Sequence, residues 1–584
     1  MKKILTIVGV IALLLVLLIA SVGVWAYYEF LYTQPLDEQE LAELTIDWDK
    51  ATGGNWSPWW DRGDGTIVWN PSASYNAWML SIPDEEKAWA GVVDLYYKHH
   101  QFLRESEDIY LFPPEMRDWD GLKVYLNDAG AHGDAEIAIE LFSRAQLGAP
   151  MYAADGFGTT GSYSNATHDR VVFDAMEHWG VENPRLLTTA GSNPSLIGYQ
   201  IESLSITRGA SRIVLADALV QLEAGDIDAW LERMDAVSRA GELVDEIPIA
   251  ITQLTSMAFV AGVNRHIAYA LQTQGERFSD AQLAAVDQIL ARHQVRGFVW
   301  EGEAMSFIDT VRRMCDKDGN YYASNLAAIG SMNLGLAEPC HLPDDELDAT
   351  AQRLIHINIT DLRSIDSAIP WVPSPEFDIE AELKKVPYMA RMMSGILITN
   401  ASMFGNSFRA HRQETIGLRL VVAMYRHRLR HGDFPGSIQM IDSELMATEP
   451  LDAFGGLLCV VVDERGLVVY SKSDDRDDDQ GAGMHEYDID ALLEPDTGTQ
   501  SMSKFRRYLK ESNGDRSHPL WVSDERFAEI EAVEPLAVDG DWVLFPIQLR
   551  APEQDDEFED IEDESGKRQS PKRGECMVRS SRRD

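Results

Sequence analysis

The densest run of potential metal ligands in this chain lies between Ser473 and Gly481. Five aspartates occupy the six positions from Asp474 to Asp479, with Arg476 among them. Carboxylate oxygens are the ligands that Ca²⁺ prefers, and the ion takes about six to eight of them. Crowded carboxylates repel one another, so a bound cation would relieve that repulsion. The run predicts either a calcium loop or a solvated acidic turn that Arg476 partly neutralises.

A second candidate for metal binding is a pair of histidines, His427 and His431, four positions apart. This spacing places both side chains on one face of a helix, as in the HExxH helices that bind zinc. The pair has no HExxH glutamate beside it, and we expect both side chains to pair with Glu or Asp at the surface. His99 and His100 are adjacent, so they face different sides of a helix and form no such pair.

Acid–base chemistry could come from Glu301 and Glu303, which flank Gly302, with Asp309 a little further on. Paired carboxylates can act as general acid and base. Chance proximity explains their spacing better, because the chain holds 95 acidic residues. We therefore assign no catalytic residue from the sequence.

The four cysteines are Cys315, Cys340, Cys459 and Cys576, and their spacing excludes CxxC redox or zinc motifs. Cys315 and Cys340 are either a disulfide pair or two buried thiols. The net charge of the 584-residue chain is −44, from 51 Lys+Arg against 95 Asp+Glu. A surface that acidic repels nucleic acid, so we expect no nucleic-acid partner.

The elements that must position these residues begin with an uncharged apolar run from Ile4 to Ala26. At about 1.5 Å per residue this run can cross a hydrocarbon core of about 30 Å. It predicts an uncleaved transmembrane anchor, although Val24-Trp25-Ala26 could serve as a cleavage site. Lys2 and Lys3 precede the run, so the N-terminus is expected in the cytoplasm and the bulk of the chain outside it. The cell membrane is then a partner through residues 4–26.

Helical periodicity dominates the middle of the chain. Gly225-Asp226 interrupts two amphipathic segments, which predicts a helical hairpin of the kind stacked in tetratricopeptide arrays. Ser279 and Gln282 form a capping box at the start of another helix. No strict repeat is visible, so the pattern indicates an irregular helical array.

The C-terminal part combines one helix with β-type runs. An apolar stripe from Leu418 to Leu429 ends at Gly432, a residue typical of helix C-termini. A second short helix is expected over Ile438 to Leu445. The expected strands are Leu457–Val462, Gly466–Ser471 and Trp542–Phe545. These elements predict a helix packed on a small antiparallel sheet.

This C-terminal part, from Thr415 to Leu549, resembles the globular domain of type II secretion major pseudopilins. That family has a long helix running into Gly-x-Tyr-Pro, a Pro-x-Asp-Pro-Phe/Trp-Gly element, a hairpin and an acidic calcium loop. The matching residues here are Gly432, Phe434-Pro435, Pro450, Asp452, Phe454-Gly455 and Tyr470-Ser471.

The resemblance implies that Asp475, Asp478 and Asp479 are the calcium ligands, although Arg476 stands where the family usually has glycine. The chain also lacks the family's leader, which puts assembly into a fibre in doubt. As a whole it looks similar to large membrane-anchored envelope proteins of planctomycete-type bacteria.

The sequence thus predicts a mainly α fold with a transmembrane helix, an irregular helical array and a small pseudopilin-like α+β module. The expected divisions are an anchor over 1–26, a stem with a Trp- and Gly-rich segment over 27–82, a helical body over 83–410, the α+β module over 411–550 and a disordered charged tail over 551–584. The expected function is a membrane-anchored, extracytoplasmic scaffold or binding protein. The alternatives are an envelope hydrolase that uses carboxylates of the helical body, or an accessory component of a secretion system.

Overall fold

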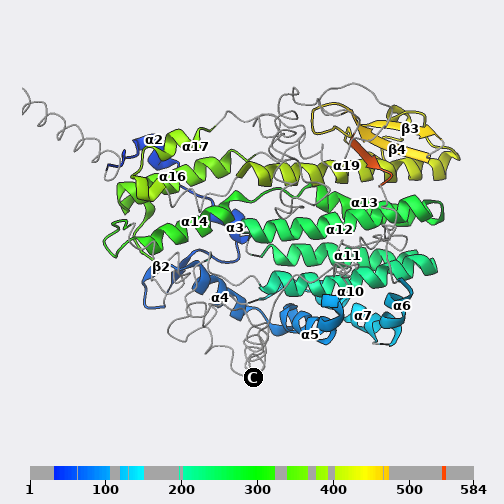
Figure 1. Ribbon diagram of the computed structural model, residues 1–584, viewed down its shortest axis with the longest axis horizontal. Helices are drawn as coiled ribbons and strands as arrows, with labels where there is room; N and C mark the ends of the chain where they lie inside the picture. Colours follow the sequence, from blue (N-terminus) through cyan, green and yellow to red (C-terminus); the bar gives the residue numbers. More distant parts are fainter. Residues whose placement is uncertain are drawn as a thin grey trace, which may run out of the picture.

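The computed structural model is mainly helical, with 64% of the described residues in helices (Figure 1). The residues that it describes are 32–61, 63–105, 119–128, 130–149, 196, 202–246, 248–322, 339–365, 377–391, 401–446, 448–463, 466–472 and 542–547.

Five long helices form the larger of the two main hydrophobic cores, and Figure 1 shows them stacked side by side. They are α10 (Glu202–Ala224), α11 (Ile227–Val244), α12 (Ala250–Gln274), α13 (Asp280–Gln294) and α19 (Ala401–His431). The predicted hairpin is confirmed: Gly225 has a φ of 80°, and the Asp226 side chain caps α11 by accepting a hydrogen bond from the Ala229 backbone N–H.

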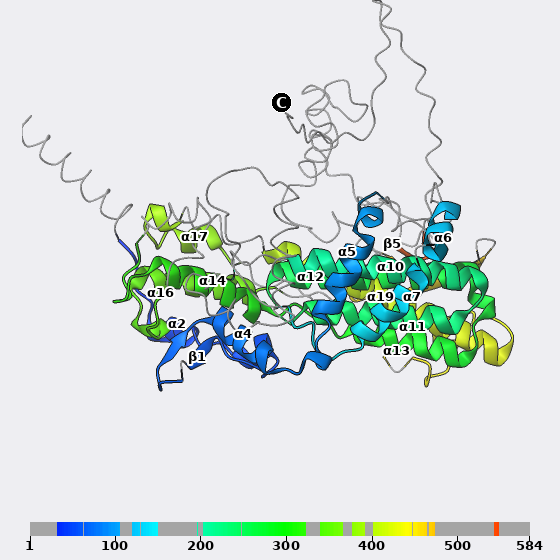
Figure 2. The ribbon, with the colours of Figure 1, turned by 90° about the horizontal axis from the view of Figure 1, so that it is seen from below.

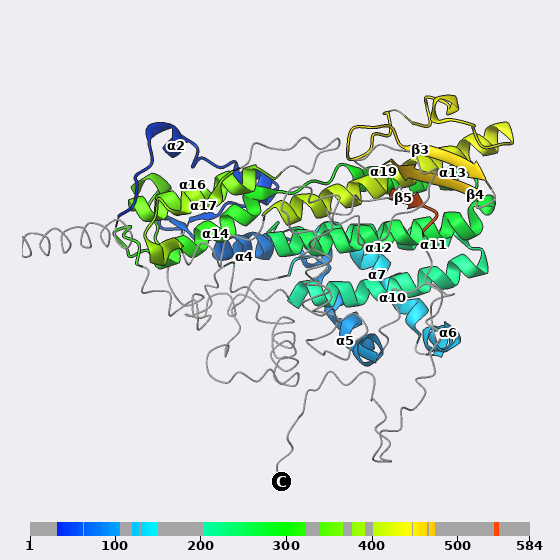
Figure 3. The ribbon, with the colours of Figure 1, turned by 45° about the horizontal axis from the view of Figure 1, so that its top comes forward.

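Three further helices flank α10 on the side away from α19 (Figure 3). They are α5 (Trp89–Glu105), α6 (Trp119–Asp128) and α7 (Ala131–Phe142). The capping box of α13 is also as predicted, because Ser279 and Gln282 satisfy each other's backbone N–H groups.

A second hydrophobic core lies at the other end of the molecule, around α14 (Trp300–Met314) and α16 (Ala349–Arg363) (Figure 2). The aromatic-rich segment after residue 52 contributes to it through the buried side chains of Trp56, Trp69 and Tyr75. The remaining elements of this end are α2 (Glu38–Ala42), α3 (Trp48–Thr52), β1 (Trp59–Asp61), β2 (Ile67–Trp69), α4 (Pro71–Ser81), α17 (Ile379–Leu383) and the 3-10 turns η1 (Asp84–Glu86) and η6 (Asp344–Glu346).

A three-stranded antiparallel sheet in the order β3-β4-β5 packs against α19 (Figure 3). Its strands are β3 (Cys459–Asp463), β4 (Gly466–Ser471) and β5 (Trp542–Phe545), close to the predicted ranges. Val469 and Leu544 of the sheet belong to the same core as the long helices. The helix α19 therefore serves as the wall shared by the sheet and the helical layers.

Two expectations about elements need correction. The helix expected over 438–445 is a single 3-10 turn, η7 (Ile438–Met440), because the backbone turns extended at Ile441. The expected membrane-spanning helix is also not part of the described fold. Within the ranges given above, no helix is both long and apolar enough to cross a membrane, since the long helices carry charged residues such as Asp217 and Arg233. Residues 1–26 lie outside the described ranges.

Candidate functional site

The three acids that the sequence singled out on α14 do not face a common point. Glu301 pairs with Lys50, with Oε1 and Nζ 3.3 Å apart. Glu303 Oε2 accepts a 2.7 Å hydrogen bond from the backbone N–H of Ala250, the first residue of α12. Glu303 therefore supplies an acceptor to the helix start that Ile249 cannot cap, a structural task.

Asp309 is buried and its oxygens have three donors. They accept hydrogen bonds from Trp69 Nε1 at 3.3 Å, from the Leu196 backbone N–H at 3.1 Å and from Arg313 Nε at 2.9 Å. A fully buried carboxylate bound by three donors from separate segments serves to hold the second core together.

A pocket of about 410 Å³ lies instead where the two cores meet. This volume falls within the range of about 300–1,000 Å³ that small-molecule sites occupy. Its walls come from α3, α4, the end of α11, the start of α12, the segment before α14 and one residue of α19. Its lining side chains include Lys50, Trp78, Glu242, Asp245, Glu246, Gln253, Ser256, Met257, Arg296 and Phe408.

Three of the lining residues are acids at the C-terminal end of α11, namely Glu242, Asp245 and Glu246. A helix C-terminus carries partial negative charge and therefore disfavours carboxylates. Arg292 pairs with Glu242 at 3.5 Å and so offsets part of this charge. The three acids therefore lie where the helix dipole disfavours negative charge. Helix stability alone does not explain acidic residues at this position.

Asp245 is the least satisfied of the three. Its Oδ2 lies 3.5 Å from Arg296 Nη2, whereas its Oδ1 is buried and has no hydrogen-bond partner among the described residues. Burial raises the pKa of Asp245 to about 7, against the opposing effects of Arg296 and of the neighbouring Ser256 hydroxyl. Near neutral pH this side chain is therefore present both as an acid and as a carboxylate.

Glu246 is held more firmly. It accepts hydrogen bonds from the Tyr75 hydroxyl at 2.9 Å and from the backbone N–H groups of Leu147 and Gly148. Burial nevertheless raises the pKa of Glu246 to about 7, because desolvation outweighs these donors. Glu246 thus joins residues 147–148 to the pocket wall.

The opposite wall of the pocket is fixed by polar side chains. Gln253 Nε2 donates to the carbonyl oxygens of Pro248 and Val299 at 2.6 and 3.0 Å, and its Oε1 accepts from the Val299 N–H at 2.7 Å. Arg296 Nη1 donates to Ser256 Oγ at 2.5 Å. These bonds hold Arg296 beside Asp245.

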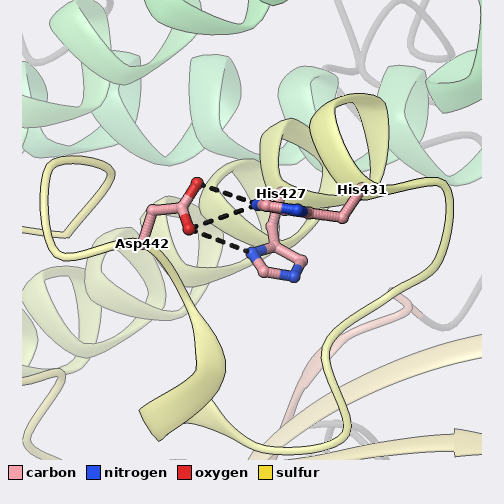
Figure 4. A group of neighbouring side chains, drawn as sticks. All are labelled: His427, His431 and Asp442. Carbon is pink, nitrogen blue, oxygen red and sulfur yellow. Dashed lines mark hydrogen bonds and ion pairs between the residues drawn. The ribbon is translucent and has the colours of Figure 1, made fainter.

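The two histidines predicted to pair with acids do so, and both meet the same one. His431 Nε2 lies 3.2 Å from Asp442 Oδ2, and His427 Nδ1 lies 3.8 Å from Asp442 Oδ1 (Figure 4). Sequence reasoning expected surface partners, but His427 is buried and only His431 is exposed. The acid that completes the cluster comes from the turn after the helix and could not be assigned from helical spacing.

The remaining predicted site residues divide into two groups. Asp475, Asp478 and Asp479 lie outside the described residues, so the calcium loop stays a prediction. Cys315 and Cys340 are both buried and both free thiols, which corresponds to the second of the two alternatives. Burial raises the pKa of Cys315, so its thiolate is disfavoured.

Comparisons with known proteins do not extend this description. No protein-family model matches the chain, and searches against curated proteins and against solved structures gave no match. The resemblance to pseudopilins, and the secretion role that it implies, therefore remain predictions.

Proposed function

We propose that this protein is a binding protein whose ligand is a small polar molecule carrying a protonated amine. The single observation that carries the proposal is the Asp245 carboxyl group, which lines a 410 Å³ pocket and whose buried Oδ1 has no hydrogen-bond partner among the described residues. A buried acceptor without a donor costs about 1–3 kcal/mol, and a ligand N–H group would remove that cost.

The charges around the pocket favour a cationic group at this oxygen. Three acids line the pocket against two cations, and both cations already have partners. Lys50 pairs with Glu301, while Arg296 contacts Ser256 and the other oxygen of Asp245. An ammonium group at Oδ1 would stabilise the ionised form of Asp245 in a partly desolvated position, where charge-assisted hydrogen bonds are strong.

The apolar lining defines the rest of the ligand. Trp78, Met257 and Phe408 line the pocket; Trp78 packs against the second core, and Phe408 comes from α19. Aromatic side chains with a few placed polar groups are typical of sites for small organic molecules. A ligand with an amine at one end and a compact apolar body fits both walls.

Isothermal titration calorimetry of the full chain with a panel of primary amines, amino sugars and uncharged sugars tests this proposal. We expect saturable heats with amines and none with uncharged sugars. The Asp245→Asn variant should lose binding, whereas Asp94→Asn, which changes an exposed acid of α5, should retain it. Equal binding by wild type and Asp245→Asn, or no saturable binding across the amines, would contradict the proposal.

A second candidate function is hydrolysis with Asp245 as a general acid or base. The specific observation in its favour is the pKa of about 7, which is the range that such a residue needs. Hydrolysis of chromogenic glycosides and esters by the wild type, lost in Asp245→Asn, would favour this function. Turnover that survives the substitution would exclude Asp245 from it.

A further inference from the structure

A distinct site lies at the C-terminal end of α19, away from the pocket acids (Figure 1). We propose that His427, His431 and Asp442 form a binding site for a divalent cation of the zinc class. The ligand atoms are His427 Nδ1, His431 Nε2 and the carboxylate of Asp442, all within 4.8 Å of one another.

The distances fit a tetrahedral ion. With bonds of about 2.0–2.1 Å to nitrogen and oxygen, two ligands of a tetrahedral zinc lie about 3.3 Å apart. Asp442 lies 3.2 Å from His431 Nε2 through one oxygen and 3.8 Å from His427 Nδ1 through the other. Figure 4 shows both rings turned toward the same carboxylate, so small side-chain rotations complete the geometry.

The burial of His427 is a second, independent observation that favours a cation at this site. Its Nδ1 is buried and has no hydrogen-bond partner among the described residues, because Asp442 at 3.8 Å is too distant. A buried ring nitrogen without a partner is costly. A cation placed between the three side chains would bond this nitrogen directly.

The sequence around the site preorganises it. His427 and His431 are one helical turn apart on a rigid helix, and their ring centroids are 4.2 Å apart. Gly432, with a φ of 96°, ends the helix and allows the chain to return, so that Asp442 faces the rings. The site thus consists of two ligands from a helix and one from the returning turn.

The ligand set selects the class of metal. Two imidazoles and one carboxylate suit zinc, nickel or copper, whereas calcium and magnesium prefer oxygen ligands alone. Three protein ligands leave a fourth position for water. Arg430 lies 3.5 Å from Asp442 through Nη1, but it also pairs with Glu444 and Asp280, so it keeps two partners when a cation takes Asp442.

Cobalt(II) provides the sharpest test, because its visible absorption is intense only in tetrahedral sites. The full chain, stripped with a chelator and desalted, is titrated with Co²⁺, and zinc is then added to displace it. We expect one tetrahedral Co²⁺ per chain, displaced by one equivalent of zinc and not by excess calcium.

The variants decide whether these three residues hold the ion. His431→Gln and Asp442→Asn change side chains that are partly exposed, and each should weaken Co²⁺ binding by more than about tenfold. The control is His411→Gln on the same helix, where the histidine pairs with Glu414 outside the cluster. Unchanged binding in both His431→Gln and Asp442→Asn, or a weak octahedral spectrum in the wild type, would overturn the proposal.

Discussion

The pocket between the two cores and the histidine cluster at the end of α19 handle carboxylates in opposite ways. Burial raises the pKa of Asp245 and Glu246 to about 7. The pKa of Asp442 is lowered, chiefly by its hydrogen bond with His431. The first site therefore holds acids whose charge is costly, and the second holds a charge that its neighbours favour. A cation would be stabilised at both sites, but for different reasons. In the pocket it would offset the cost of a buried negative charge, and at the cluster it would join a charge that is already favoured.

The largest effect is expected from a substitution that displaces the backbone of the pocket wall. Gly302 of α14 packs so closely on Pro248 that a Cβ would overlap the Pro248 carbonyl group. Gly302→Ala should therefore destabilise the protein by about 3 kcal/mol and abolish ligand binding at the pocket. The histidine cluster, in the other core, should keep its Co²⁺ affinity in the folded variant.

Urea denaturation measures the stability change, and Gly262→Ala is its control. Gly262 is also helical, on α12, but nothing lies within 4 Å of the position of its Cβ. That substitution should stabilise the protein by about 0.5–1 kcal/mol. A similar loss in both variants would show that the packing at Pro248 is not the cause.

The next effect concerns Glu246, one acid of the pocket. Glu246→Ala leaves the Leu147 and Gly148 N–H groups without their acceptor, while the Tyr75 hydroxyl keeps the Ala149 carbonyl oxygen, and we expect a loss of about 2–3 kcal/mol in the free energy of unfolding. Glu246→Gln keeps one acceptor oxygen and should lose only about 1 kcal/mol. Denaturant midpoints that do not separate the two variants would contradict this role of Glu246.

The free energy of unfolding should depend on pH with opposite signs at the two sites, because the pKa of Asp245 is raised and that of Asp442 is lowered. Asp245 keeps its proton in the folded state up to about pH 7 but releases it near pH 4 when unfolded. The folded state then binds more protons in this window, so this contribution to stability falls as the pH rises from about 4 to 7, by at most about 1.4 kcal/mol per pH unit.

The measurement is the difference in unfolding free energy between wild type and Asp245→Asn at several pH values. This difference removes the contribution of His266 and His293, whose pKa values burial lowers to about 3 and whose effect on stability has the opposite slope. A difference that stays constant between pH 4 and 7 would show that Asp245 titrates normally.

The smallest effect is expected at the cluster without metal. Asp442→Asn removes an ion pair at a partly exposed position, where salt screens the attraction. Because the pKa of Asp442 is lowered, its stabilisation is present above about pH 4 and is lost as the pH falls below that value. Chelator-treated protein, unfolded at low and high salt, tests this; a loss as large as that of Glu246→Ala would reverse the comparison.

Local signals in the sequence predicted the elements well. The break at Gly225-Asp226, the capping box at Ser279 and the stop at Gly432 each depend on residues within one or two turns, and the structure places them as expected. The prediction of a helix over 438–445 was wrong. Ile441 and Leu445 are both buried, as in an amphipathic helix, but the backbone is extended at Ile441, and the apolar pattern alone does not distinguish the two cases.

The sites depended on contacts between distant residues, and here the sequence said less. The spacing of His427 and His431 was visible, but Asp442 joins them only through the return of the chain after Gly432. The sequence did not single out Asp245 and Glu246 among 95 acids. Their position at the C-terminus of a predicted helix, where acids are unfavourable, could have indicated them. Glu301 and Glu303 were noticed instead, and the structure gives them separate partners.

The helix α19 connects the pocket rigidly to the histidine cluster. Phe408 lines the pocket and His427 lies 19 positions further along the same helix, a span of about 28 Å at about 1.5 Å per residue. A tilt of about two degrees at one end moves the other by about 1 Å over such a span. Whatever fixes the histidine end therefore limits the angular freedom of the pocket wall, and any such coupling acts equally in the reverse direction.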